Sequence, residues 1–167
     1  MTRELSDKDF EELAAQLAGG DSGLSRVISE HGMPDFWHRP PGFATLSLFI
    51  VEQQVSLDSA KAVFERLHQR VGEVTAHNLL RASLDDLRRC GLTRQKLRYL
   101  LDLARQVADG VLDLESLAGL DDAGAREILL SVTGVGPWTA DVYLLSALRR
   151  PDIWPVGDRA LQVGTGE

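Results

Sequence analysis

Cysteine is almost absent from this sequence, and its scarcity excludes several kinds of site. Cys90 is the single cysteine among 167 residues. An internal disulfide, a zinc site built on cysteines and an iron–sulfur cluster with four cysteine ligands are therefore excluded within this chain. The histidines, at positions 31, 38, 68 and 77, show none of the short spacings typical of metal ligands. The sequence predicts no metal centre and no cofactor.

Long apolar runs are also lacking, and we expect no secretory leader. The chain begins MTRELSDKDFEEL, which is charged from its first residues, and no apolar stretch approaches the length that spans a bilayer. With 44% hydrophobic and 26% charged residues, the composition is that of a globular protein rather than a disordered one. We therefore expect a soluble, cytoplasmic protein of one domain, residues 1–167, with no membrane partner.

An excess of basic residues is missing as well. The chain has 18 Lys and Arg against 25 Asp and Glu, a net charge of −7, whereas proteins that bind phosphate backbones usually carry a basic excess. The total argues against a nucleic-acid partner, but the distribution is uneven. Acidic residues crowd SDKDFEE and DLESLAGLDDAGARE, while RRCGLTRQKLR is locally basic, so the net charge leaves the partner open.

The alternation of apolar and polar residues that marks a half-buried strand is not found, whereas helical spacing runs through nearly the whole chain. The expected helix caps include Ser6, in a capping box with Asp9, then Ser56, and either Asp121 or Asp122. The first helix places four apolar residues on one face: Phe10, Leu13, Ala14 and Leu17. The pattern predicts an all-α protein of short helices, in two lobes with a groove between them.

A break between two apolar helices is the most informative segment. TGVGPWTAD runs from Thr133 to Asp141, between REILLSV and VYLLSAL. Glycines 134 and 136 permit positive φ and close approach by a ligand, Val135 can turn inward, and Pro137 suits the first position of a helix. The free N–H groups of such a helix start form an anion site. The same pattern also suits an ordinary helix corner, and the spacing leaves both interpretations open.

Asp158 stands between DIWPVG, a break containing Pro and Gly, and RALQV. Aspartate is a favoured N-cap, so its role here is in one interpretation purely structural. In the other, the backbone donors and the helix dipole keep the carboxylate ionised, and it stabilises a developing cation or orients a water.

Two glutamines, Gln53 and Gln54, end an apolar helix in EQQVS. Polar residues at this place usually do no more than terminate the helix, but a flat amide side chain at a loop tip can also fill a gap between DNA bases. Trp37, Trp138 and Trp154 raise a similar question, since tryptophans pack in a core or groove more often than they stack on a ligand.

Four segments, IVEQQVS, GLTRQKLRYL, TGVGPWTAD and DIWPVGDRAL, together resemble the helix-hairpin-helix DNA glycosylase superfamily. Within it the chain is most similar to the 3-methyladenine DNA glycosylase II branch, which excises alkylated bases. The resemblance extends from about Leu24 to Val163, with the motifs in the family's order. It implies the helix-hairpin-helix glycosylase fold, damaged double-stranded DNA as the partner, and a nucleoid-associated protein if the source is bacterial.

The resemblance also assigns roles to particular residues. Asp158 would be the catalytic carboxylate, since its interval from Trp138 is the one expected between these motif positions. Gln54 would be the wedge inserted into the base stack, and Trp138 and Trp37 would line the base pocket. A DNA phosphate would be gripped by the backbone N–H groups of a hairpin made of Thr133, Gly134, Val135 and Gly136. In this family the hairpin carbonyls often share a monovalent cation, Na⁺ or K⁺.

Trp138 also bears on the type of reaction. Bifunctional relatives place a nucleophilic lysine at this position, and indole cannot form the Schiff base that leads to strand cleavage. The resemblance therefore implies a monofunctional hydrolase in base excision repair, which releases alkylated purines of the 3-methyladenine and 7-methylguanine type and has no AP lyase activity.

The end of the chain departs from the family pattern. Family members continue past the catalytic aspartate with further helices, whereas this sequence ends at Glu167, so the resemblance implies a domain shortened after that motif. A non-catalytic DNA-binding remnant and a helical protein-interaction domain stay open beside the enzyme. No pattern in the sequence specifies an oligomeric state.

Overall fold

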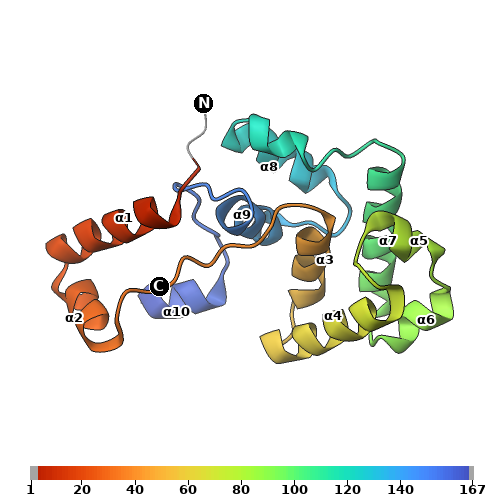
Figure 1. Ribbon diagram of the computed structural model, residues 1–167, viewed down its shortest axis with the longest axis horizontal. Helices are drawn as coiled ribbons and strands as arrows, with labels where there is room; N and C mark the ends of the chain where they lie inside the picture. The colour runs from red at the N-terminus through yellow and green to blue at the C-terminus, as the bar shows by residue number, and fades with distance from the viewer. Residues whose placement is uncertain (1–3, 166–167) are drawn as a thin grey trace.

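The computed structural model describes residues 4–165, which contain helices and no strand (Figure 1). None of these helices is long and apolar enough to cross a membrane. The α-helices and the single 3₁₀ helix are α1 (Asp7–Gly20), α2 (Ser22–His31), α3 (Phe43–Glu52), α4 (Leu57–Val71), α5 (Ala76–Arg81), α6 (Leu84–Arg89), α7 (Arg94–Ala108), η1 (Ser116–Gly119), α8 (Asp122–Ser131), α9 (Pro137–Ser146) and α10 (Arg159–Thr165). The predicted all-α class is confirmed.

Local capping explains where several helices begin. The Ser6 hydroxyl accepts a hydrogen bond from the Asp9 N–H, and the Asp9 carboxylate accepts one from the Ser6 N–H, which completes the predicted capping box. Ser56 caps α4, and Asp121 rather than Asp122 caps α8. Such caps satisfy backbone donors that a helix start leaves unpaired, so they depend only on neighbouring residues.

Helix α3 is the centre of the packing. Six of its ten residues are buried, and it contacts α4, α7 and α9. Figure 1 shows it between α9 on one side and α7 on the other. The predicted two lobes therefore meet at this helix, with α4 to α7 forming one lobe and α8 and α9 the other.

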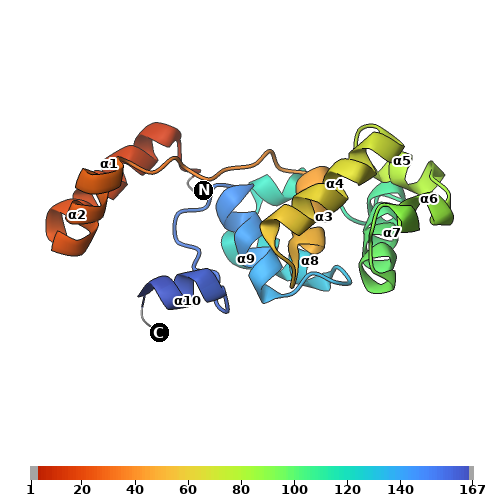
Figure 2. The same cartoon turned by 90° about the horizontal axis from the view of Figure 1, so that it is seen from below.

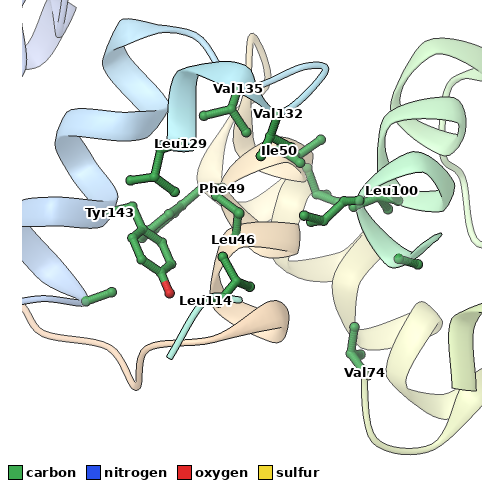
Figure 3. Close-up of a cluster of buried hydrophobic side chains, with 14 of the residues drawn as sticks. Leu46, Phe49, Ile50, Val74, Leu100, Leu114, Leu129, Val132, Val135 and Tyr143 are labelled. Carbon is green, nitrogen blue, oxygen red and sulfur yellow. The ribbon is translucent and has the colours of Figure 1, made fainter. Parts of the chain in front are cut away.

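An aromatic pair fixes α3 against α9. Phe49 meets Tyr143 edge to face, with the ring centroids 6.4 Å apart, an arrangement that the opposite charges of ring faces and edges favour. The Tyr143 hydroxyl in turn accepts a hydrogen bond from the N–H of Gly42, the residue before α3. Figure 3 shows both rings within the buried cluster that also holds Leu46 and Leu129.

Helices α1 and α2 form an N-terminal arm, residues 7–31, that extends away from the other helices (Figures 1 and 2). Neither helix contains a buried residue, and Leu17 on the predicted apolar face of α1 is 65% exposed. Phe10 on the same face does have a partner, since its ring stacks on that of Phe36 in the loop before α3, with the centroids 5.0 Å apart. Helical spacing shows which residues share a face but not what packs on it, so the face is covered only in part. Arg149 connects the arm to the body through an ion pair with Asp7 and a contact with the Phe36 ring.

The difference between the core and the arm predicts two opposite outcomes. Phe49→Ala should lower the free energy of unfolding by about 3–5 kcal/mol, because it empties a fully buried site, whereas Leu17→Ala should change it by less than about 0.5 kcal/mol. Denaturant unfolding followed by circular dichroism measures both values. A large loss of stability in Leu17→Ala would mean that the Leu17 side chain is covered after all.

Candidate functional site

The segment from Thr133 to Gly136 forms a tight turn between α8 and α9. The Val135 N–H donates to the Val132 carbonyl at 3.0 Å, and Val135 is buried, beside Ile50 of α3 in Figure 3. Gly134 has φ +89°, which L side chains rarely adopt. A Cβ at Gly134 would also lie 2.3 Å from a ring carbon of Tyr99. Both its backbone conformation and its packing therefore require glycine at position 134.

Gly136 is different, because nothing in the folded chain requires it to be glycine. Its φ is −95°, and a Cβ there would meet no atom within 4 Å. It precedes Pro137, the first residue of α9, and no side chain caps this helix start. The first-turn N–H groups of α9 therefore lack intrahelical partners, and the space beside Gly136 is open, as at an anion site.

Asp158 acts as the cap that the sequence indicated, and it also contacts Trp138. Its Oδ1 atom accepts hydrogen bonds from the N–H groups of Ala160 and Leu161, at 2.9 and 3.1 Å. Its Oδ2 atom accepts one from the Trp138 indole N–H at 2.8 Å. The indole hydrogen bond is the main reason that the pKa of Asp158 lies below its ordinary value, and the two backbone donors lower it further. The carboxylate is held ionised and oriented.

Gln54 follows α3 with φ +57°, in the left-handed region that residues other than glycine rarely occupy, at a cost of roughly 1 kcal/mol. Its side chain is exposed. A strained backbone at an exposed tip is a feature often found at functional sites.

One groove of about 910 Å³ brings most of the predicted residues together. Gln54 and its neighbours line one part of it, Gln95 and Tyr99 of α7 another, and the hairpin with Trp138 and Asp158 the rest. Glu52 also lines it, and burial raises the pKa of Glu52 even though Arg39 lowers it.

Trp37 does not line this groove. It lies in the loop before α3, with its ring 6.3 Å from the Phe49 ring and the Arg39 guanidinium 5.5 Å from its ring centroid. Of the two tryptophans that the resemblance assigned to the base pocket, Trp138 lines this groove and Trp37 does not. The spacing gave no sign of this, because Trp37 belongs to an irregular loop without periodicity.

Sequence reasoning missed the contacts that Gln53 and Tyr99 make within the groove. The Gln53 amide donates a hydrogen bond to the Gly134 carbonyl, and the Tyr99 ring packs against Gly134. Each of these contacts joins residues far apart in the sequence, so no local pattern indicates them. The described residues contain no group of three His, Cys, Asp or Glu side chains that could hold a metal ion.

Residues 48–165 match the model of the HhH-GPD superfamily of base excision DNA repair proteins. The chain belongs to that superfamily. Among curated relatives, a putative DNA-3-methyladenine glycosylase of Bacillus subtilis is 27% identical over 84% of this chain and 52% of its own length. The chain thus spans about half the length of such relatives.

Solved structures agree with this assignment. A DNA-3-methyladenine glycosidase from Bacillus halodurans is 33% identical, with a TM-score of 0.74 over 89% of this chain and 69% of its own. The 3-methyladenine DNA glycosylase Mag1 of Schizosaccharomyces pombe, in complex with abasic DNA, has a TM-score of 0.82 at 22% identity, over 92% of this chain and 78% of its own. Glycosylase/lyases also have this fold, so the fold alone leaves strand cleavage open.

The contact between Trp138 and Asp158 makes a prediction that needs no substrate. In Trp138→Phe the ring remains but the N–H donor is lost, so the pKa of Asp158 should rise towards its ordinary value. A carboxyl carbon NMR titration measures it. Trp154→Phe is the matched control, because Trp154 is exposed in the same segment. An unchanged pKa in Trp138→Phe would show that the indole does not donate to the carboxylate.

Proposed function

We propose that this domain is a monofunctional DNA glycosylase that hydrolyses the N-glycosidic bond of alkylated purines in double-stranded DNA. The observation that carries the proposal is the position of Asp158, an ionised carboxylate that lines the same groove as the hairpin and Gln54. The carboxylate is suited to an oxocarbenium-like sugar, and the backbone donors are suited to a phosphate. The exposed amide is suited to a base stack.

Binding begins at the hairpin. The N–H groups at the start of α9 donate to a DNA phosphate, and the open space at Gly136 lets the phosphate approach the backbone. Two carbonyls of the turn already accept hydrogen bonds: that of Gly134 from the Gln53 amide, and that of Gly136 from the Ala140 N–H. A monovalent cation bound at this turn would therefore be held by the other carbonyls.

The lesion must leave the helix before it can react, because its glycosidic bond is out of reach within the stack. Gln54 enters the gap and offsets part of the unstacking cost, which is a few kcal/mol. The strained backbone of Gln54 holds its side chain outward from the end of α3, so the wedge is in place before DNA binds.

Bond cleavage needs little acid catalysis for this class of lesion. A purine alkylated at N3 or N7 carries a positive charge, so it leaves with the electron pair of the C1′–N bond as a neutral base. Asp158 stabilises the positive charge that develops on the sugar, or orients the water that adds to C1′ and loses a proton. The Trp138 ring lies beside this carboxylate, where its electron-rich face suits a cationic base.

The positions of the lysines support the proposal that the domain has no lyase activity. Lysines stand at positions 8, 61 and 96, and none of them lines the groove that contains Asp158. The Lys96 ammonium donates to the carbonyls of Val51 and Gln53, both at 2.8 Å. An amine held in this way is not free to attack C1′, so borohydride should trap no covalent complex.

The decisive experiment compares base release by the native chain and Asp158→Asn on a duplex with methylated purines. The rate should fall roughly 100-fold or more, because the charge that stabilises the sugar cation is lost. Asparagine is also a good N-cap, so α10 and duplex binding should persist. Equal rates would reduce Asp158 to a helix cap, and binding without release by either protein would favour the non-catalytic remnant.

Gly136→Ala tests the hairpin without a folding defect. The added methyl group meets nothing in the free protein but occupies the space that the phosphate needs, so duplex affinity should fall roughly tenfold, the value of about one charged hydrogen bond. Fluorescence anisotropy measures it, with Gly19→Ala in the arm as the matched control. Unchanged affinity would remove the hairpin from the DNA interface. Gly134→Ala is the poorer test, because its Cβ would clash with Tyr99 and disturb the fold as well.

A further inference from the structure

The two adjacent glutamines at the end of α3 lie in different surroundings. Gln54 is exposed, whereas Gln53 is half-buried and both N–H groups of its amide are used. Its Nε2 atom donates to the Gly134 carbonyl at 2.8 Å and to the Thr139 hydroxyl oxygen at 2.9 Å. Gln53 therefore joins the end of α3 to the hairpin and to the first turn of α9.

The backbone of Gln53 is held by α7, which belongs to the lobe that does not contain the hairpin. Lys96 of α7 donates from its ammonium group to the carbonyls of Val51 and Gln53, and burial lowers the pKa of Lys96. A cation at the C-terminus of a helix satisfies carbonyls that lack intrahelical partners and complements the helix dipole. Three elements, α3, α7 and the hairpin, thus meet at one residue, and Gln54 is the next residue along the chain.

We infer that Gln53, seated by Lys96, is a positioning residue that fixes Gln54 relative to the phosphate-binding hairpin. This role rests on the proposed function, and it gives the two glutamines different tasks. Gln54 enters the stack, and Gln53 sets how far from the gripped phosphate it does so. A displacement of about 1 Å in such an arrangement costs far more in rate than in binding.

The hairpin itself does not depend on Gln53 for its shape. Val135 is buried in the core and Gly134 rests on the Tyr99 ring, so the turn keeps its place when the amide is lost. The phosphate grip and the insertion of Gln54 are therefore separable. Loss of the Gln53 hydrogen bonds should affect unstacking of the lesion and spare binding to undamaged duplex.

Gln53→Met is the direct test, because methionine has a similar length but no N–H donors. The reporter is 2-aminopurine placed beside a methylated purine in a duplex, since its fluorescence rises when the neighbouring base leaves the stack. We expect the unstacking signal and the single-turnover release rate to fall about tenfold or more, with affinity for undamaged duplex unchanged within about twofold. Gln69→Met, an exposed glutamine on α4, is the matched control and should match the native chain.

A second substrate separates positioning from a general structural defect. Opposite an abasic site the lesion is already unpaired, so most of the flipping cost is gone. Gln53→Met should therefore regain most of the native rate on this substrate, as should Gln54→Ala. The double variant Gln53→Met/Gln54→Ala should be no slower than Gln54→Ala alone, because residues that act as one unit are not additive.

Three results would overturn the inference: native unstacking by Gln53→Met, an equal loss on paired and unpaired lesions, or additive losses in the double variant. A native chain that unstacks no base would overturn it as well. A native chain that unstacks the lesion but releases no base would instead contradict the proposed hydrolysis, and the fluorescence of the variants would still decide the role of Gln53.

Discussion

The contact between Gly134 and the Tyr99 ring determines where the rest of the site can be. Because position 134 has no side chain and a positive φ, the turn after α8 lies directly on α7. The packing of Gly134 on Tyr99 sets where α9 begins, and α9 carries Trp138, whose indole donates to Asp158. On its other side the turn is held by Val135, which is buried in the core beside α3. A side chain at position 134 would clash with Tyr99 and displace the hairpin, α9 and the carboxylate together.

Under the proposed function, an acidic chain can bind DNA because backbone N–H groups rather than basic side chains make the phosphate contacts. Backbone N–H groups at a helix start supply a partial positive charge whatever the net charge of the protein. The net charge of −7 weakens long-range attraction to the duplex more than it weakens the contact itself.

Local features of this protein were readable from its sequence, and long-range ones were not. Ser6, Ser56 and Asp158 cap helices as their neighbours predicted, because a cap involves residues two or three positions apart. The hairpin lies between its two helices for the same reason. The contact of Gln53 with Gly134 spans 81 positions, and a pair so distant leaves no periodic pattern. The absence of Trp37 from the groove lining and the exposure of Leu17 on α1 also depend on which elements meet. A single sequence does not encode this in its spacing.

The tie between Trp138 and Asp158 also links the proposed reactive group to the docking of the segment that carries it. Asp158 lies at the start of α10 and reaches α9 through a bond that its ionised form accepts best. Its pKa is lower in the folded state, so the bond adds stability at neutral pH, and that contribution is lost as the pH falls through the folded pKa. Protonation would silence the carboxylate and loosen α10 in a single event. The protection of the α10 amides, relative to their intrinsic exchange at each pH, would therefore follow the charge state of Asp158.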